Sequence, residues 1–475
     1  MEKLLTPDLC VIGGGAGGLD AAMTAAQLGA SVVLIEKHRM GGDSLNYGCV
    51  PSKSLQAAAK RAQAMRETAR FGVKPVEPAI DHRLVNEHVK SVIAAIAPND
   101  SAERCAGLGV QVVAGAARFK DKSTVLAGDI EIQARRFVIA TGSSPELPPI
   151  PGLDKIGYLT NETIFDVNYR IGHLIVVGGG AVGLELAQAH RRLGSEVTVI
   201  EGLTPLPTED QELVAVAVQR MRREGVRILD NARLDRLEPF GQNVQVVFTK
   251  DGRSYSIDGT HLLVASGRRP NVEGLNLEAA GVRYDRGGVA VSDSLRTSNH
   301  RIYAIGDVVG DAPFAHMASH HAQVVVRNAL FRWPARVDRL GMPRIAYTEP
   351  EVAQVGVSEE EARRRYGQRI RVLRWPYHEN DRAQAERTTD GFVKVVADRD
   401  GRILGAGAVG ESAGEVIQVW ALAMQAGIRM RAMADYVAPY PTLGEINQRA
   451  AQSFFMPSLT NPMIRRVIGW LARFG

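Results

Sequence analysis

Two passages of the chain share one pattern of apolar and polar positions. Each begins with a short apolar run, passes through a glycine-rich turn, continues as a stretch of helical periodicity, and returns to a second apolar run. The first, residues 9–37, is LCVIGGGAGGLDAAMTAAQLGASVVLIEK, and the second, residues 173–202, is HLIVVGGGAVGLELAQAHRRLGSEVTVIEG. Apolar runs of this length beside glycine-rich turns are typical of buried strands. Each passage therefore predicts a strand–helix–strand unit of a parallel sheet.

Shorter signals of the same kind follow. Apolar runs end in glycine at 136–142 (RFVIATG), 261–267 (HLLVASG) and 302–306 (IYAIG). The first of these leads into a proline-rich connector, which indicates a domain boundary near residue 150. Beyond residue 343 the pattern changes to strands over 391–410 and a helix over 413–427, which predicts a separate α+β domain. The predicted fold class is α/β, with two Rossmann-like dinucleotide-binding domains and a C-terminal α+β domain.

The glycines of the two turns have the spacing of a dinucleotide-binding site. The first glycine permits the tight bend, the second lets the backbone approach a pyrophosphate, and the third lets the helix pack closely on the strand. The helix N-terminus then faces the phosphates, and a carboxylate ending the second strand accepts hydrogen bonds from the ribose. These residues are Gly13, Gly15, Gly18 and Glu36 in the first unit and Gly178, Gly180, Gly183 and Glu201 in the second.

Two such units predict two bound dinucleotides. Glu201 is followed by GLTPLPTED, which contains no arginine to hold a 2′-phosphate, so NADH is favoured over NADPH. The first unit is then expected to hold FAD.

Composition narrows the class of protein. The 475 residues are 45% hydrophobic, so the chain is long enough for several domains with their own cores. The net charge of +5 is spread along the chain, which argues against nucleic-acid binding. There are only three cysteines, and Cys10 lies in an apolar run, which disfavours a disulfide-stapled secreted fold. With no signal-peptide pattern and no apolar run of membrane-spanning length, we expect a cytoplasmic enzyme.

A series of segments occurs in the order found in one enzyme family. On these motifs the chain resembles the flavoprotein pyridine nucleotide-disulfide oxidoreductases, the group that contains dihydrolipoamide dehydrogenase, glutathione reductase and mercuric reductase. The resemblance covers nearly the whole chain. The motifs are the two glycine-rich units, GCVPSK (48–53), ATGSSP (140–145), AIGD (304–307), YTEPEVAQVG (347–356) and YPTLGE (440–445).

The resemblance implies a domain organisation. It places an FAD-binding domain at 1–150, an NAD(H)-binding domain at 151–272, a central domain completing the FAD site at 273–342, and an interface domain at 343–475. The interface domain is expected to form a homodimer with active sites shared between subunits.

The resemblance also implies roles for single residues. Lys53 lies four residues after Cys49, in the first turn of a helix begun by Pro51, and is paired with Glu185 beside the flavin. A cation there stabilises the anionic reduced ring. The other residues expected to contact the cofactors are Asp307 at the ribityl chain, His316 at the start of a helix that faces the flavin, and Gly42, Thr141, Gly142 and Gly267.

Two positions depart from the family pattern. The family has Cys-x4-Cys, whose first thiol exchanges with the substrate, but here Ser44 takes the first position and only Cys49 remains. The family also has a histidine before the proline of the C-terminal motif, where this chain has Tyr440, although Glu445 is kept. A serine cannot form a disulfide, and a tyrosine with a pKa of about 10 is a poor acceptor of a thiol proton. The two changes predict that dithiol–disulfide exchange is lost or relocated.

Three functions are compatible with this pattern. The first is an NADH-dependent oxidoreductase that passes electrons through FAD to a non-dithiol acceptor: a quinone, oxygen, a metal ion, or a small thiol or persulfide at Cys49. The second is a disulfide reductase like dihydrolipoamide dehydrogenase or mercuric reductase, which the two losses disfavour. The third is a non-catalytic FAD-binding redox sensor or partner protein. Cys49 itself is either redox-active or a packing residue, and the acceptor pocket is expected to be lined by Ser44, Tyr47, Tyr440 and Glu445.

Two further features of the sequence bear on function. His316, His320 and His321 occur without accompanying cysteines or carboxylates, so no metal site is predicted. Residues 461–475 have a basic amphipathic pattern and are expected either to pack on the dimer or to contact a membrane peripherally. The apolar residues of this tail are Met463, Ile464, Val467, Ile468, Leu471 and Phe474, and its arginines are Arg465, Arg466 and Arg473.

Overall fold

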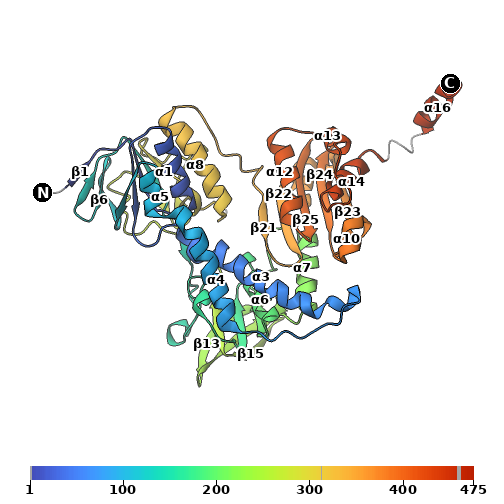
Figure 1. The fold of residues 1–475 in the computed structure, drawn as a ribbon, viewed down its shortest axis with the longest axis horizontal. Helices are drawn as coiled ribbons and strands as arrows, with labels where there is room; N and C mark the ends of the chain where they lie inside the picture. The colour runs from blue at the N-terminus through green and yellow to red at the C-terminus, as the bar shows by residue number, and fades with distance from the viewer. Residues whose placement is uncertain (1–2, 312, 457–461, 475) are drawn as a thin grey trace.

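The computed structural model describes residues 3–311, 313–456 and 462–474. Two parallel sheets, each flanked by helices, are joined to an antiparallel sheet near the C-terminal end (Figure 1). This arrangement confirms the predicted α/β fold class.

The first glycine-rich unit forms the centre of a five-stranded parallel sheet with the order β20-β8-β2-β3-β4. Four of its strands are buried on both faces, as expected of parallel strands covered by helices, whereas the edge strand β4 is partly exposed. Strand β20 comes from the segment predicted to be the central domain, which therefore extends the first sheet. Helix α8 (Ala315–Leu330) packs against α1. The elements are β2 (Leu9–Ile12), α1 (Ala16–Gln27), β3 (Val32–Glu36), β4 (Val110–Ala114), β8 (Arg136–Ile139) and β20 (Ile302–Ala304).

The second unit builds a separate parallel sheet with the order β12-β11-β10-β16. A three-stranded antiparallel sheet, β13 (Arg233–Phe240), β14 (Asn243–Lys250) and β15 (Arg253–Gly259), is inserted between β12 and β16. The elements of the parallel sheet and its helices are β10 (His173–Val177), α6 (Ala181–Arg192), β11 (Glu196–Ile200), α7 (Gln211–Arg223), β12 (Arg227–Leu229) and β16 (His261–Val264).

The C-terminal sheet is antiparallel with the order β21-β22-β25-β24-β23. The helix predicted over 413–427 is divided at Ile417 into α11 (Ala413–Val416) and α12 (Gln418–Gln425). The fully buried Trp420 on α12 helps to form the core of this domain. The strands are β21 (Arg344–Ala346), β22 (Glu351–Gly356), β23 (Ile370–Pro376), β24 (Phe392–Asp398) and β25 (Ile403–Gly410).

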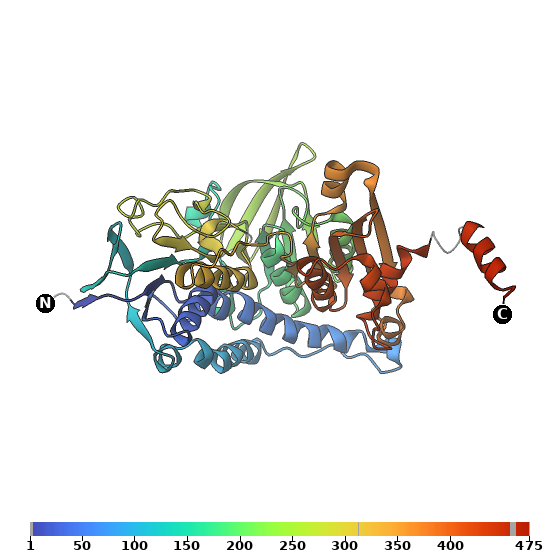
Figure 2. The same cartoon turned by 90° about the horizontal axis from the view of Figure 1, so that it is seen from above.

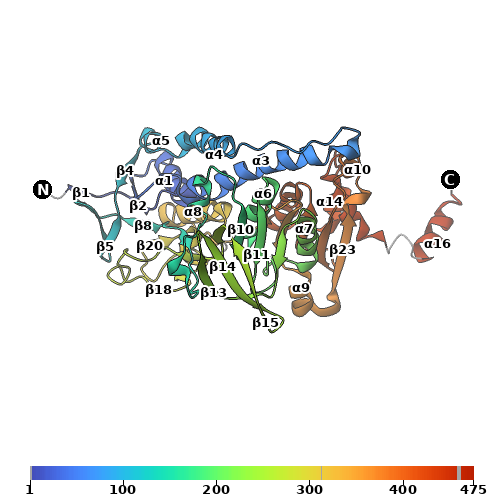
Figure 3. The same ribbon diagram turned by 90° about the horizontal axis from the view of Figure 1, so that it is seen from below.

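One long helix, α3 (Cys49–Arg66), runs from the first unit towards the C-terminal sheet (Figures 2 and 3). It begins at Cys49 and not at Pro51, so the predicted start was wrong by two residues; Pro51 lies within the first turn, where its missing N–H is tolerated. Helix α3 packs on α4 (His82–Ile96) and α6. Among the described residues, we find no helix with the length and apolar character needed to cross a bilayer.

A group of charged residues, here called the charge network, joins α3, the second unit and the C-terminal domain. Lys60 Nζ lies 2.9 Å from Glu349 Oε1 and 2.7 Å from Glu411 Oε1. Arg192 holds Glu224 with two hydrogen bonds of 2.7 and 2.8 Å and also contacts Glu349. Burial disfavours the charged form of Glu349, but Arg192 and Lys60 outweigh it and lower the pKa of that carboxyl.

A second buried cation, Lys394 on β24, fastens α7 and α9 (Glu359–Tyr366) to the C-terminal sheet. Its Nζ lies 2.7 Å from Asp210 Oδ2, 2.8 Å from Glu212 Oε2 and 2.9 Å from Glu359 Oε2. Hydrogen bonds from Arg374, assisted by Lys394, lower the pKa of Glu212 to about 2.

This cluster makes a prediction about acid stability. The folded-state pKa of Glu212 lies below its unfolded value of about 4.3. Its contribution to the stability of the fold is therefore present when the pH is above the unfolded pKa, and it is lost as the pH falls towards 2. Because the carboxylate is partly exposed, we expect Glu212→Gln to cost about 1 kcal/mol at pH 7. Urea unfolding of the FAD-saturated protein should give a smaller difference between wild type and variant at pH 3. A difference that is equal at both pH values would contradict this assignment.

Candidate active site

The first glycine-rich turn is too close-packed at two of its glycines to accept a side chain. At Gly13, where φ is +108°, an added Cβ would lie 2.3 Å from Ala140 O, and at Gly18 it would lie 1.9 Å from Gly13 O. At Gly15 the nearest atom would be 3.7 Å away, at Gly42 Cα. Helix α1 begins here without a side-chain cap. The open approach at Gly15 and the uncapped helix fit the pyrophosphate of a dinucleotide.

The second unit repeats this geometry. An added Cβ at Gly183 would lie 2.1 Å from Gly178 O, whereas Gly180 faces open space. Helix α6 also begins without a side-chain cap. The second turn therefore fits a second pyrophosphate.

The two strand-end carboxylates are held in the same way. Glu36 accepts hydrogen bonds from the backbone N–H of Gly14 at 2.6 Å and of His38 at 2.7 Å. Glu201 accepts them from Gly179 at 2.6 Å and Leu203 at 2.8 Å. Both carboxylates thus lie at the mouth of a glycine turn, where the sequence predicted ribose contacts.

Other predicted cofactor residues lie where the first and second units meet. The hydroxyl of Thr141 donates to Asn271 O at 2.7 Å, and Asn271 N–H donates to Gly142 O at 2.9 Å. Gly267 O accepts from the N–H of Glu146 at 3.0 Å, which continues the pairing of β9 (Ser143–Pro145) with β17 (Arg268–Pro270).

Asp307 lies in a polar group at the same junction. Its Oδ2 accepts from the hydroxyl of Ser143 at 2.6 Å and lies 3.8 Å from Arg268 Nε. Arg268 also lies 3.3 Å from Asp43 Oδ1. Sequence reasoning missed Arg268 and Asn271, although both belong to the SGRRPN segment that follows a recognised strand-and-glycine signal.

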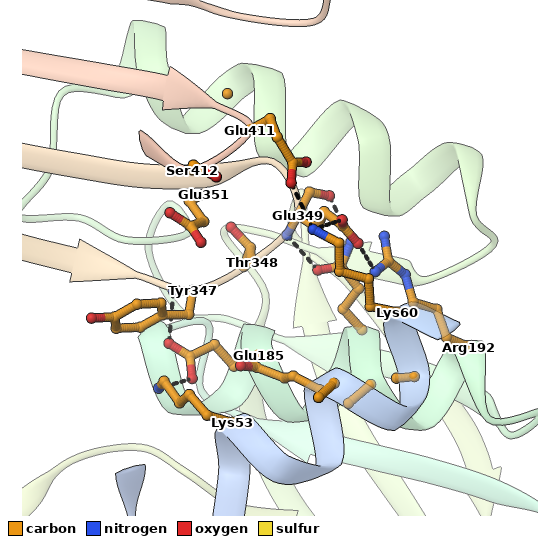
Figure 4. Close-up of a pocket in the computed structure, with 16 residues that line it drawn as sticks. Lys53, Lys60, Glu185, Arg192, Tyr347, Thr348, Glu349, Glu351, Glu411 and Ser412 are labelled. Atoms are coloured by element: carbon orange, nitrogen blue, oxygen red, sulfur yellow. Dashed lines mark hydrogen bonds and ion pairs between the residues drawn. The ribbon is translucent and has the colours of Figure 1, made fainter. Parts of the chain in front are cut away.

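Lys53 and Glu185 form an ion pair between α3 and α6 (Figure 4). Lys53 Nζ lies 2.8 Å from Glu185 Oε2, and the side chain of Glu185 is only 6% exposed. Glu185 Oε1 accepts from the backbone N–H of Tyr347 at 2.9 Å. Lys53 Nζ also lies 4.2 Å from the centroid of the Tyr347 ring. The Lys53–Glu185 ion pair and Tyr347 therefore hold one another in position.

Tyr347 is a site residue that sequence reasoning missed. It begins the YTEPEVAQVG motif, which was used only to identify the family. Partial burial raises the pKa of Tyr347, and the charge of Glu351 raises it further. The phenol therefore stays protonated at neutral pH and is able to donate a hydrogen bond.

A cavity of about 180 Å³ opens beside this ion pair (Figure 4). It is lined by residues of α3, of α6 and of the loops at the edge of the C-terminal sheet, including members of the charge network. Burial raises the pKa of Glu351 on its wall. The cavity is therefore polar and carries both signs of charge.

The sulfur chemistry of the chain is limited to Cys49. All three cysteines are free; Cys10 and Cys105 are fully buried, and only Cys49 is exposed. Ser44 lies in the short helix α2 (Gly42–Asn46), directly before α3. No cysteine of the chain is therefore available to close a disulfide with Cys49 within one subunit.

Tyr440 and Glu445 have different partners. The hydroxyl of Tyr440 donates to Asp381 Oδ2 at 2.6 Å, and this hydrogen bond raises the pKa of Tyr440. Glu445 is buried at the start of α14 (Glu445–Ser453) and pairs with Arg449 at 2.8 Å. Asp381 was not predicted, because no sequence spacing links it to residue 440. The meeting of Tyr440 with Cys49 across a dimer stays a prediction.

His316 and His321 have different hydrogen-bond partners. His316 in the first turn of α8 bonds through Nε2 to Pro343 O at 2.8 Å. His321 is fully buried and accepts the N–H of Gly306 at Nδ1, and burial lowers its pKa to about 4. Among the residues that the structure describes, no group of three or more histidine, cysteine or acidic side chains is placed to hold a metal ion.

Comparison with known proteins places this geometry in a family. The model of the pyridine nucleotide-disulphide oxidoreductases matches residues 7–322, and the model of their dimerisation domain matches residues 342–451. The chain belongs to this family. Its members bind FAD and use NAD(P)H, so the chain is a flavoprotein oxidoreductase, and the dimerisation domain supports a homodimer. The predicted family is confirmed.

Several relatives within the family match almost the full chain. A mercuric reductase of Streptomyces lividans is 35% identical over 456 residues, which cover 94% of this chain and 96% of the relative. A dihydrolipoyl dehydrogenase of Staphylococcus aureus is 36% identical over the same length and with the same coverage. Among solved structures, LpdA of Mycobacterium tuberculosis is 30% identical with a TM-score of 0.86, covering 94% of this chain and 99% of that one. The Cu(II) complex of the flavoprotein disulfide reductase RclA of Escherichia coli is 27% identical with a TM-score of 0.84, covering 95% and 100%.

Proposed function

We propose that this protein is an NADH-dependent FAD oxidoreductase whose electron acceptor is a quinone and not a disulfide. The observation that carries the proposal is the solitary thiol: Cys49 is exposed, and the other two cysteines are buried. Ser44 stands where a disulfide reductase has its exchange thiol, and a hydroxyl cannot replace it.

The choice of cofactors is supported by the two glycine turns. The first is proposed to hold FAD through Gly13, Gly15, Gly18, Gly42 and Glu36, with Asp307 at the ribityl chain. The second is proposed to hold NADH, since Glu201 is suited to accept hydrogen bonds from ribose hydroxyls and the residues after it include no cation for a 2′-phosphate. A bound FAD supplies hydride acceptance from NADH and two-electron delivery to an acceptor.

The phenol beside Lys53 suits an acceptor that takes up protons and is not reduced by thiol exchange. Burial raises the pKa of Tyr347, so its phenol keeps its proton at neutral pH, whereas the hydroxyl of Tyr440 already donates to Asp381. A quinone takes up two electrons and two protons, and phenols are hydrogen-bond donors for its oxygens. Oxygen and metal ions are the competing non-dithiol acceptors.

A second candidate arises from the exposure of Cys49. An accessible thiol at the start of a helix is able to form a mixed disulfide with a small thiol or persulfide. This function requires the sulfur, whereas direct quinone reduction does not.

The deciding experiment compares wild type with Cys49→Ser under anaerobic conditions. We expect NADH-dependent reduction of a soluble naphthoquinone by both proteins at similar rates, and no turnover of lipoamide by either. Loss of all activity in Cys49→Ser would favour the thiol-dependent candidate. Brisk lipoamide turnover by wild type would refute the proposal, and a flavin that NADH does not bleach would indicate a redox sensor.

The matched converse variant is Ser44→Cys, which restores the second thiol. Wild type is expected to take up a single equivalent of NADH per FAD in an anaerobic titration, because only the flavin is reducible. Ser44→Cys is expected to take up a second equivalent, used to reduce a new disulfide with Cys49. A second equivalent in wild type would show that another redox couple exists.

A further inference from the structure

The C-terminal helix α16 (Pro462–Leu471) lies beyond residue 451, where the match to the family's dimerisation domain ends. At about 100° per residue, its large apolar side chains and Phe474 fall within an arc of about 160°. The remaining arc contains Gly469, Ala472, Arg466 and Arg473. The tail is therefore divided into one apolar and one basic side. Residues 461 and 475, which the sequence analysis included in the tail, lie outside the described residues.

The apolar side is turned to solvent. The exposed fractions are 50% for Val467, 59% for Ile468, 57% for Trp470, 54% for Leu471 and 73% for Phe474. The rings of Trp470 and Phe474 pack edge to face with their centroids 4.9 Å apart. Figures 1 and 2 show α16 apart from the sheets, at the opposite end of the molecule from β1 (Lys3–Leu5).

The positive charge of the tail favours one of the two surfaces that α16 could contact. Residues 462–474 contain three arginines and no acidic residue, and the whole chain has a net charge of +5. A second copy of the chain brings the same positive tail and the same positive net charge. An anionic lipid surface provides the opposite charge for the arginines and an apolar layer for the other side.

We propose that α16 docks peripherally on anionic phospholipid membranes. The apolar side inserts at the boundary between headgroups and acyl chains, and Arg466 and Arg473 contact lipid phosphates. With 10 residues, the helix is about 15 Å long, too short to span a bilayer, so it lies in the plane of the surface. A homodimer presents two such helices, and simultaneous binding of both strengthens the attachment. Docking is independent of the acceptor, although it would bring the proposed quinone reductase to lipid-soluble quinones.

The test is co-sedimentation of the FAD-loaded full-length protein with vesicles of phosphatidylcholine, with and without phosphatidylglycerol. Binding is expected only with phosphatidylglycerol and is expected to weaken with added salt, because the charge term is screened. A chain ending at residue 461 is expected to lose binding. Arg466→Glu with Arg473→Glu should weaken binding at least about tenfold. Val467→Ser with Leu471→Ser, which preserves the charge, should also release the protein.

A matched control changes the same number of charges elsewhere. Arg233→Glu with Arg253→Glu, on exposed positions of the inserted sheet, is expected to leave vesicle binding intact. The rate of flavin reduction by NADH should be unchanged in every tail variant, which separates this inference from the proposed function. Equal binding to neutral vesicles, binding by the shortened chain, or no binding by wild type would overturn it. If the shortened chain became a monomer in sedimentation velocity, the apolar side of α16 would instead be assigned to contact between copies of the chain. That result would also overturn the membrane proposal.

Discussion

Replacing Lys53 by methionine is expected to slow the reduction of the flavin by NADH about 100-fold. The proposed role of Lys53 is to place a fixed positive charge where negative charge develops on the reduced ring. Its position is set by Glu185 at 2.8 Å and by the Tyr347 ring at 4.2 Å, so the charge is oriented before the reaction begins. The variant also leaves the carboxylate of Glu185, 6% exposed, without its cation. Stopped-flow absorbance of the flavin under anaerobic conditions measures the rate.

Lys60→Met is the matched control for this variant. Lys60 lies on the same helix and pairs with two glutamates, but it is about 10 Å further along the axis. We expect its flavin reduction to stay close to that of wild type. If both variants were equally slow, the total charge of the cavity would matter and not the position of Lys53. A wild-type rate in Lys53→Met would refute the proposed role.

Arg192→Met is expected to cost about 3 kcal/mol of stability, the second large effect. Arg192 is 4% exposed and holds the equally buried Glu224 with two hydrogen bonds while contacting Glu349. Removing the guanidinium leaves the buried carboxylate of Glu224 with Arg220 and that of Glu349, 27% exposed, with Lys60, and a buried carboxylate that loses a cation is costly. The measurement is the urea midpoint of the FAD-saturated protein, with a lower midpoint expected.

Arg382→Met tests whether burial is the cause. Arg382 forms an ion pair at 2.5 Å with Glu386, one turn along its helix, but the two side chains are 49% and 40% exposed. An exposed pair of this kind contributes well under about 1 kcal/mol, so this variant should unfold almost as wild type does. Similar losses in both variants would contradict the argument from burial.

The charge network also bears on how the active site is assembled. Lys60 comes from α3, Arg192 and Glu224 from the domain of the second parallel sheet, and Glu349 and Glu411 from the C-terminal domain. The same three parts supply Lys53, Glu185 and Tyr347 a short distance away. Loosening the network by Arg192→Met would therefore also disturb the position of the proposed catalytic cation.

The local pattern of the chain was sufficient for much of the architecture. The two glycine-rich passages became β2–α1–β3 and β10–α6–β11, because apolar runs and glycine spacing act over neighbouring residues. The ion pair of Lys53 with Glu185 was also expected, but only from family resemblance. No local rule connects two residues that lie 132 positions apart.

The sequence alone determined the two dinucleotide turns, the α/β class and the lack of a second thiol beside Cys49, since each depends on residue identity and short-range spacing. Only the tertiary structure decided the partners: Tyr347 under Lys53, Asp381 on Tyr440, Arg268 near Asp307, and Arg192 between Glu224 and Glu349. These contacts join residues of different elements. They arise from how the sheets and α3 pack together, and that packing leaves no periodic signal in the chain.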